Sequence, residues 1–399
     1  MNTAASLYIH IPFCAGACDY CDFYSVAANS AGQDEQRLDQ YVTAVLADIE
    51  DQFSFSGIRQ VPTVYIGGGT PSVLGARRVG RLLAGLSSLL SGMDSTPVEF
   101  TVEANPESAD DDFLQTCRTG GVNRLSLGIQ SFYEPSRRAI HRLGNANILD
   151  ERLALAARYF PGAFSADLIS GLPFQTENIL LDDIKRLLAF EPSHVSLYSL
   201  TVEQDTPLEQ NLRQGMVSLP DISEADALWL IGRDALEQAG FPQYEISNFA
   251  LPEKYCVHNL RYWRMESWLA AGPAASGTII NDETGTGRRL SYAADIDAYL
   301  VAPRPAFSRA IVEELDQAVL MRESLLMGFR CGKGPDAVLF QQRFGRGIAE
   351  CIPRAIAHWQ EQGFFENAAA PALAPSRKGM LFLDAFLRDV FFELEKNNH

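Results

Sequence analysis

Short β-prone runs alternate with helical patterns through the first half of the chain, and this alternation limits the folds open to it. Each run ends near Gly, Pro, Asn or Cys, and the six runs are 7–11, 61–66, 99–103, 124–129, 165–169 and 195–200. Between the first two runs, apolar residues from Leu38 to Phe53 recur every three or four positions, which predicts a helix with one buried face. A strand followed by a helix, six times over, predicts parallel pairing. We therefore expect an α/β fold, either an open doubly wound sheet or a partial (β/α)6 barrel of TIM type that stops short of eight strands.

The pattern changes after residue 200. We expect a helix over 224–239, a loop-rich segment over 241–277 and a mostly helical tail from about Gln317. The sequence Ala302-Pro303-Arg304-Pro305 is typical of a linker. With 399 residues, 47% of them hydrophobic, the chain can bury a barrel-sized core and still form a second unit. We expect a first domain at 1–300 and a smaller, mainly helical domain at 301–399.

Several polar and glycine-containing motifs follow or close a predicted strand. They are Cys14, Gly67 to Thr70, Glu103, Gln130 and the segment 171–173. Because the carboxyl ends of parallel strands meet at one edge of a sheet or barrel, we expect these motifs to form one shared site.

Three of the seven cysteines crowd into the loop after the first strand. Cys14, Cys18 and Cys21 form a C-x3-C-x2-C pattern, whereas the other four are scattered, unlike a disulfide framework. Three thiolates so spaced can hold three irons of a 4Fe-4S cubane and leave the fourth iron open. An electron passed to a sulfonium bound at that iron would break a carbon–sulfur bond and give a carbon radical. A zinc site completed by His10, or purely structural cysteines, is the alternative.

The net charge of −17, from 33 basic and 50 acidic residues, repels polyanions. We find no basic patch, so we expect neither a nucleic acid nor an anionic membrane as partner. No apolar stretch is long enough to span a membrane, and the first residues lack the pattern of a signal peptide. These features predict a soluble, cytoplasmic protein without a transmembrane segment.

The segment Leu7-Tyr-Ile-His-Ile-Pro-Phe-Cys14, with Cys18 and Cys21, resembles the start of the radical S-adenosylmethionine (SAM) family that contains oxygen-independent coproporphyrinogen III oxidase and the haem chaperone HemW. Further motifs extend the resemblance along most of the chain: Gly67-Gly-Gly-Thr-Pro71, Glu103-Ala-Asn-Pro106, Arg124-Leu-Ser-Leu-Gly-Ile-Gln-Ser-Phe132, Asp167-Leu-Ile-Ser-Gly-Leu-Pro173, Ser196-Leu-Tyr-Ser-Leu200 and Tyr244-Glu-Ile-Ser-Asn-Phe249.

The resemblance implies a 4Fe-4S cluster on the three cysteines and SAM beside it. It places the methionine part of SAM against the turn of Gly67, Gly68 and Gly69, where backbone groups can approach a ligand closely. Ribose hydroxyls or the amino group of SAM would be held by Glu103, Asp167 and Gln130. Tyr8 and Thr70 complete the expected cofactor-binding residues. Taken singly, acidic residues at strand ends can also be ordinary solvated loop residues.

Two features are similar to the HemW group within that family. Phe23 stands where coproporphyrinogen oxidases carry a further cysteine, which argues against coproporphyrinogen dehydrogenase activity, and His258-Asn-Leu-Arg-Tyr-Trp263 matches the HNxxYW motif. A neutral imidazole such as His258 is a common axial ligand of haem iron, and the two aromatic residues offer flat faces for a porphyrin. The alternative is a core histidine with two core aromatics. Likewise, Cys256 is either a second haem contact or a buried apolar residue, and Arg261 and Arg264 pair either with porphyrin propionates or in surface salt bridges.

The resemblance therefore implies a haem chaperone whose partners are haem, haem-accepting proteins and a low-potential electron donor. Oxidative decarboxylation of coproporphyrinogen III is the second reading. The chain departs from the family pattern at Asn145 and Asn147, at Ser170 and Phe174, and around Ser276. A third reading, a scaffold that keeps its cluster only for structure, would explain the departures near Asn145 and Ser276.

Overall fold

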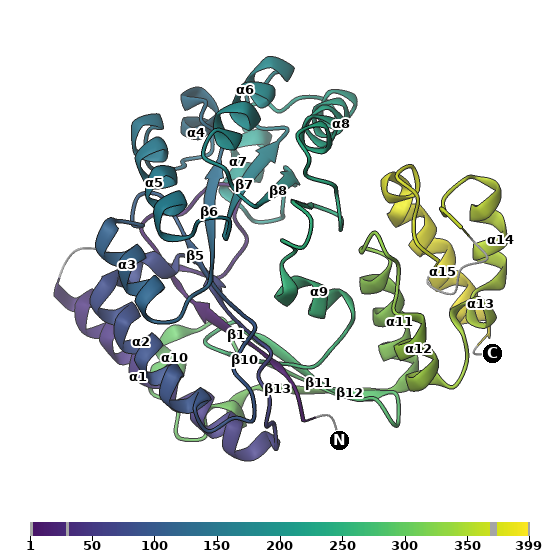
Figure 1. Ribbon diagram of the computed structural model, residues 1–399, viewed down its shortest axis with the longest axis horizontal. Helices are drawn as coiled ribbons and strands as arrows, with labels where there is room; N and C mark the ends of the chain where they lie inside the picture. Colours follow the sequence, from purple (N-terminus) through teal and green to yellow (C-terminus); the bar gives the residue numbers. More distant parts are fainter. Residues whose placement is uncertain (1–2, 29–31, 368–372, 398–399) are drawn as a thin grey trace.

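The computed structural model describes residues 3–28, 32–367 and 373–397, and its centre is a curved sheet of parallel strands (Figure 1). Six strands lie in the order β1, β4, β5, β6, β7, β8 and pair in parallel. Their bounds agree with the six predicted runs to within two residues: β1 Ser6–Ile11, β4 Thr63–Gly68, β5 Glu99–Ala104, β6 Arg124–Gln130, β7 Phe164–Ser170 and β8 His194–Ser199. The prediction of a partial α/β barrel is confirmed.

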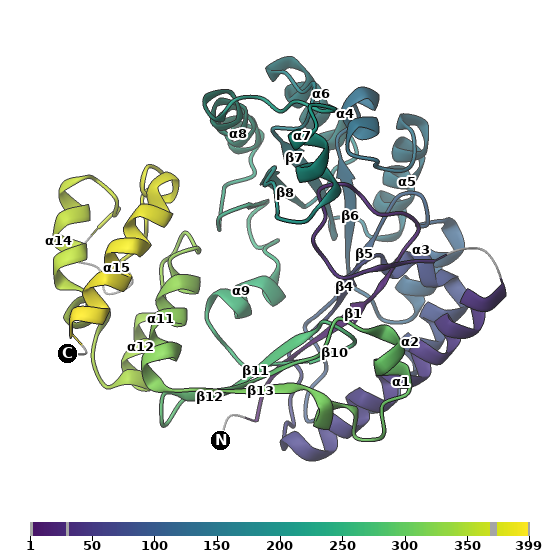
Figure 2. The ribbon, with the colours of Figure 1, turned by 180° about the vertical axis from the view of Figure 1, so that it is seen from behind.

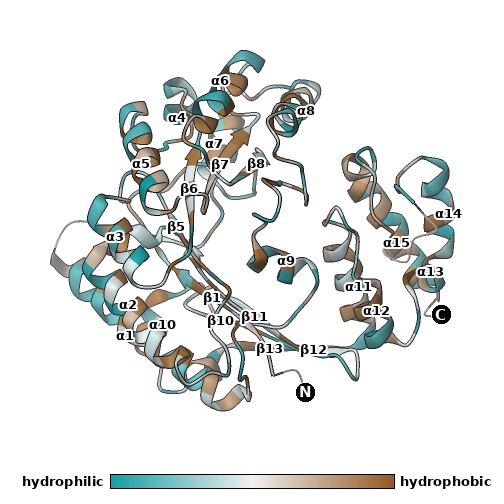
Figure 3. Ribbon diagram, in the orientation of Figure 1, coloured by the Kyte–Doolittle hydropathy of each residue, from teal (hydrophilic) through white to brown (hydrophobic). Residues whose placement is uncertain are grey.

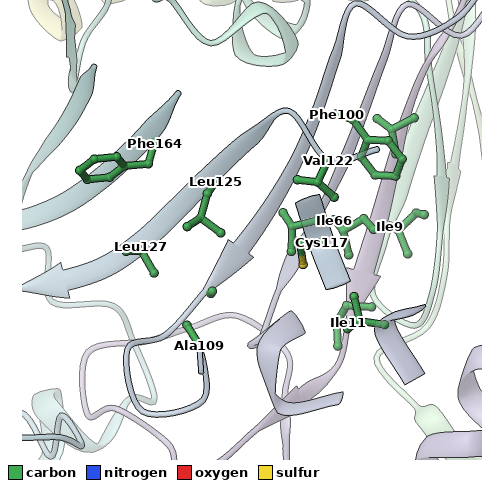
Figure 4. Close-up of a cluster of buried hydrophobic side chains, with 14 of the residues drawn as sticks. Ile9, Ile11, Ile66, Phe100, Ala109, Cys117, Val122, Leu125, Leu127 and Phe164 are labelled. Carbon is green, nitrogen blue, oxygen red and sulfur yellow. The ribbon is translucent and has the colours of Figure 1, made fainter. Parts of the chain in front are cut away.

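Amphipathic helices cover the outer face of these strands. They are α1 Gly32–Ser56, α2 Gly75–Leu90, α3 Asp111–Thr119, α5 Ala146–Tyr159, α6 Glu177–Leu188 and α8 Ile222–Gln238. Apolar side chains of the strands, such as Ile9, Ile66 and Leu125, pack with Cys117 of α3 in the layer between strands and helices (Figure 4). Each buried aliphatic side chain contributes about 1.5–3 kcal/mol, so this layer fixes the positions of the strand ends. The outer faces of the helices are the hydrophilic ones (Figure 3).

The sheet continues on both sides of the six parallel strands. On one side β9 (Asn248–Ala250) pairs antiparallel with β8, and on the other β10 (Trp268–Ala271) pairs in parallel with β1. Antiparallel strands then extend the β10 side: β11 Ser276–Asn281, β12 Thr286–Ser291 and β13 Ile311–Leu315. The prediction of a loop-rich 241–277 segment is wrong for β9, β10 and the helix α9 (Val257–Trp263) between them. These elements are too short to carry a readable periodicity, and tertiary pairing forms them.

The C-terminal helices form a second lobe with its own core (Figures 1 and 2). They are α11 Gln317–Gly328, α12 Ala337–Phe344, α13 Ile348–Cys351, α14 Pro353–Glu361 and α15 Leu383–Asn397. The rings of Phe364 and Phe329 lie 4.4 and 4.8 Å from that of Phe386 at its centre. In both views α9 lies between this lobe and the open side of the barrel. The sheet reaches residue 315, so the domain division at residue 300 stays a prediction.

No helix in the described part of the chain combines the length and the apolar character that crossing a bilayer requires.

Candidate functional site

The three clustered cysteines lie on a loop at the carboxyl end of β1. This loop leaves β2 (Phe13–Cys14) and returns through β3 (Val26–Ala27), and the two short strands pair with each other. Asp19 anchors the middle of the loop, because its N–H donates to the Ile140 carbonyl at 3.0 Å and its own carbonyl accepts from the Leu208 N–H at 2.9 Å. The loop is therefore held over the strand ends by contacts with segments far along the sequence.

All three cysteines are free and partly exposed. Burial is the main reason that the pKa of the Cys21 thiol is raised to about 11, and the nearby Cys18 and Cys14 sulfurs contribute to it. The three sulfurs are therefore within electrostatic reach of one another. A positively charged iron centre between them would favour the thiolate form that ligates metal. Within the described residues, no three His, Cys, Asp or Glu side chains gather tightly enough to hold one metal ion.

His10, the fourth ligand of the zinc alternative, has both ring nitrogens occupied. Its Nε2–H donates to the Tyr24 carbonyl at 2.9 Å, and its Nδ1 accepts from the Tyr8 hydroxyl at 3.0 Å. An imidazole with both nitrogens so bonded has no lone pair left for a metal. In this arrangement His10 positions Tyr8 instead of completing a metal site.

The glycine turn at the end of β4 packs directly against the cysteine loop. Gly68 has φ of +106°, and a Cβ atom there would lie 2.5 Å from Nδ1 of His10. A Cβ atom on Gly69 would lie 2.7 Å from the Phe13 carbonyl oxygen and 3.1 Å from the Cys14 sulfur. Glycine is therefore required, and the backbone of the turn reaches the cysteine loop as the sequence predicts.

Glu103 joins the glycine turn to the interior of the barrel. Its carboxylate accepts from the Tyr65 hydroxyl at 2.6 Å and from the Gly68 N–H at 3.1 Å. Burial raises the pKa of this carboxyl to about 7, and the Tyr65 hydroxyl partly offsets that rise. Burial, with the charge of Glu103 second, also raises the pKa of Tyr8. Glu103 can therefore change its ionisation near neutral pH when a charged ligand approaches.

Two buried acceptors at the same end of the barrel have no hydrogen-bond donor among the described residues: Oε1 of Gln130 and Oδ1 of Asp167. Gln130 has φ of 68° and follows a register shift in the pairing of β6 with β7, which turns its side chain away from the regular alternation. Leaving such an acceptor unpaired costs about 1–3 kcal/mol. A ligand that brings hydroxyl and ammonium donors would satisfy both. SAM carries these groups, so the residues present fit this cofactor.

Arg142 is a site residue that the sequence does not reveal. Its guanidinium donates to the Asn105 side-chain oxygen at 2.7 Å, to the Gly128 carbonyl at 2.5 Å and to the Cys18 sulfur at 3.5 Å. Asn105 in turn donates to the Thr70 hydroxyl, which lies 3.3 Å from the Cys14 sulfur. A fixed positive charge is thereby held beside the sulfurs, where it stabilises thiolates. No local sequence pattern indicates that Arg142 contacts the cluster cysteines, because Cys18 lies 124 positions away in the sequence.

The HNxxYW motif lies at the opposite, amino end of the barrel. Oγ1 of Thr63, the first residue of β4, lies 2.8 Å from Nδ1 of His258. The first residue of β5, Glu99, accepts from the N–H groups of Val257 and His258 at 2.8 and 2.9 Å and so caps the start of α9. The structure therefore brings together the cysteines, the glycine turn, Glu103, Gln130 and Asp167, but it does not bring His258 to them.

His258 is 1% exposed, and the rings of Tyr65 and Tyr262 lie 5.0 and 4.7 Å away. Burial, with Arg261 second, lowers the pKa of His258 to about 3, so the imidazole is neutral. The Thr63 hydroxyl donates to Ser6, so it accepts the proton on Nδ1 of His258. Nε2 then carries a lone pair, and no donor in the described part of the chain forms a hydrogen bond with it. A role for this lone pair in haem ligation stays a prediction.

A partial barrel of parallel strands, with three cysteines in the loop after its first strand, is the architecture of the radical SAM class. The profile of the Radical SAM superfamily matches residues 8–187, and that of the HemN C-terminal domain matches residues 315–382. The heme chaperone HemW of Lactococcus lactis is 33% identical over 90% of this chain and 92% of that protein. The mitochondrial radical S-adenosyl methionine domain-containing protein 1 of Bos taurus is 34% identical over 90% of this chain and 76% of that protein. The chain belongs to the HemW family of the radical SAM superfamily.

The solved structure of HemN from Escherichia coli, a coproporphyrinogen III oxidase, superposes with a TM-score of 0.79. The match covers 97% of this chain and 90% of that chain, at 20% sequence identity. It therefore confirms the predicted fold, helical C-terminal region included. Membership in the superfamily implies a 4Fe-4S cluster and SAM.

Proposed function

We propose that the protein is a haem chaperone of HemW type, which binds a 4Fe-4S cluster, SAM and haem and passes the haem to acceptor proteins. The observation that carries the proposal is the similarity to the chaperone from Lactococcus lactis, which is 33% identical in sequence over 90% of this chain. A match of that extent includes both the barrel and the region beyond it. The partners that follow are haem-accepting proteins and a low-potential electron donor.

Cys14, Cys18 and Cys21 are the cluster ligands in this proposal. When bound, the cluster supplies the low-potential electron that reductive cleavage of a sulfonium needs. The guanidinium of Arg142 donates a hydrogen bond to the Cys18 sulfur and places its positive charge beside it. Because the three clustered cysteines are free thiols, the proposal also places the protein in a reducing compartment, the cytoplasm.

SAM is held by the carboxyl end of the barrel in this proposal. The backbone of Gly67, Gly68 and Gly69 faces its methionine part, with Tyr8 and Thr70 beside that turn. The unpaired acceptors of Gln130 and Asp167 take its hydroxyl or ammonium donors. Glu103 retains lone pairs beyond those used by Tyr65 and Gly68, and an ammonium group near it would favour its ionised form.

Phe23 supports the chaperone over the oxidase. It lies two positions after Cys21, where the oxidases that the chain resembles carry another cysteine, and the residue is 65% exposed. The chain therefore offers a bare aromatic ring beside the cluster loop in place of a thiol.

The test begins with protein reconstituted with iron and sulfide without oxygen. It is given reductant, SAM and coproporphyrinogen III, and the products are separated by chromatography. In a second assay the protein is titrated with ferric haem and then mixed with a haem-free acceptor protein. We expect haem uptake, haem transfer and no protoporphyrinogen. Formation of protoporphyrinogen would reject the chaperone in favour of the oxidase, and a protein that binds neither haem nor SAM would be the scaffold.

A further inference from the structure

A cavity of about 630 Å³ lies between α9 and residues 329–336, which connect α11 to α12. Tyr244, Tyr255, Leu260, Trp263 and Arg264 line it from the barrel side, and residues 331–338 line it from the C-terminal lobe. Small-molecule sites in proteins fall roughly between 300 and 1,000 Å³, and they favour the junctions of domains. The cavity therefore has the size and the position of a ligand site, and the residues of the cluster site do not line it.

The barrel-side wall is aromatic. The rings of Tyr244 and Tyr255 lie 4.6 Å apart at 44°, and Trp263 closes the wall from the end of α9. The Tyr244 hydroxyl is fixed by His194 at 2.8 Å, so this wall is rigid. Flat apolar faces of this kind stack against a planar conjugated ring.

Two cations lie at the same cavity in a chain of net charge −17. Arg264 lines it from the end of α9, and Lys333 lines it from the opposite lobe. Both charges reach Cys331 on the wall, where they offset part of the burial that raises the pKa of its thiol. Arg264 forms an ion pair with Glu266 at 3.8 Å, which is longer than a hydrogen bond, so its guanidinium can still donate to another anion. Asp336 also lines the cavity, and its carboxylate accepts from the Val338 and Leu339 N–H groups at the start of α12. The ligand that fits is a planar apolar ring with two carboxylates at its edge.

We propose that this cavity is the haem site of the chaperone, with the porphyrin between Trp263 and Tyr255 of the barrel side and the 331–337 segment. The proposal rests on the proposed function and gives its haem a location. Arg264 and Lys333 pair with the two propionates, since a cation and a carboxylate form a strong charge-assisted hydrogen bond. Cys331 lines the cavity, and its thiol donates to the Tyr244 carbonyl at 3.8 Å. In this proposal the thiol exchanges that contact for the iron, because a cysteine thiolate can ligate haem iron.

His258 has a different task in this proposal. It is enclosed between Tyr65 and Tyr262, and its Nδ1–H is held by Thr63. Its Nε2 is buried, so a porphyrin could reach that atom only if the side chains around it moved. His258 therefore positions α9, and the same helix presents Trp263 and Arg264 to the cavity.

The experiment titrates ferric haem into the full-length, cluster-loaded protein and records the absorption spectrum. The main variant combines Arg264→Glu with Lys333→Glu, and the matched control is Lys185→Glu on the exposed face of α6. We expect the double variant to weaken haem binding at least tenfold and the control to leave it unchanged. Cys331→Ala should shift the Soret band without changing the melting temperature by more than a few degrees, and the melting temperature is recorded for every variant.

The outcome separates the cavity from the wider proposal. If the wild type takes up haem, both the double variant and Cys331→Ala behave like it, and His258→Gln loses the haem, then the cavity is rejected and the chaperone stands. A wild type that takes up no haem rejects both.

Discussion

The two ends of the barrel are built from the same strands but differ in how their buried polar groups are paired. At the carboxyl end the sulfurs are partly exposed, and acceptors of Gln130 and Asp167 are buried without donors in the described structure. At the amino end Glu99 and Thr63 are paired with α9, which covers the strand starts. The buried acceptors without donors mark the carboxyl end as the place for a ligand. At the amino end the strand starts pair with α9, and Nε2 of His258 is the buried group described above that this pairing leaves unsatisfied.

The largest expected effect is loss of the cluster on changing one sulfur. Cys18→Ala should reduce bound iron and sulfide after reconstitution to near zero, since a cubane with two protein ligands is not retained. The free energy of unfolding of the metal-free protein should change by less than about 1 kcal/mol, because the residue is partly exposed. Cys351→Ala, in the C-terminal core, is the control that should keep its iron. Equal iron in both variants would remove the cysteine loop from the cluster site.

A substitution at the amino end should lower the stability of the protein and leave its cofactor content unchanged. Glu99→Ala removes the acceptor of the Val257 and His258 N–H groups. Leaving these two donors without their acceptor should lower the free energy of unfolding by about 3 kcal/mol in urea titrations. Iron content should remain that of the wild type.

Glu224, an exposed member of the capping box of α8, provides the matched control for Glu99. Its change to alanine should cost less than about 1 kcal/mol. If the Glu99 variant unfolded no more easily than this control, the amino end would not be closed in the way the hydrogen bonds indicate.

A third prediction uses the raised pKa of Glu103. Its folded-state pKa of about 7 lies above the ordinary value of 4.5, so the folded protein holds a proton that the unfolded chain has released. Stability should therefore fall as the pH rises from about 4.5 to about 7, by about 3 kcal/mol from this group. Glu103→Gln should remove that part of the fall in urea titrations at pH 5 and pH 7.5. Glu245, whose pKa burial also raises to about 7, should leave a residual slope, and a slope identical to the wild type would contradict the prediction.

The smallest effect should come from Thr63→Val. The valine keeps the shape but leaves Nδ1–H of His258 without its acceptor, which should cost about 1.5 kcal/mol. Thermal unfolding measures it, with Thr201→Val on the surface as the control expected to stay within about 0.5 kcal/mol. A stabilised Thr63 variant would mean that His258 finds another partner inside the barrel.

The six strands of the barrel could be predicted because each is long enough to show its pattern and ends at a residue that stops it. The gathering of Gly68, Glu103 and Gln130 followed from that, since parallel strands bring their carboxyl ends together. Three- and four-residue strands such as β9 and β10 carry no pattern of their own. They form because β8 and β1 offer them backbone partners.

The site residues that sequence reasoning missed are those whose meaning depends on a distant partner. Arg142 gains its role from Cys18 and Gly128, and Glu99 from a helix more than 150 residues later. His258 was recognised by its motif, but the motif does not say which end of the barrel it occupies. The tertiary contact with Thr63 places His258 at the amino end of the barrel.

The first strand of the chain lies in the interior of the finished sheet, between β4 and β10. The ribosome therefore releases β1 with both of its edges bare, and the second edge stays bare until residues 268–271 have been synthesised. An exposed strand edge invites pairing with other chains. Nascent chains that stall between β8 and β10 should thus be the most prone to aggregate. At that stage the cysteine loop follows a strand, β1, that has not yet paired with β10.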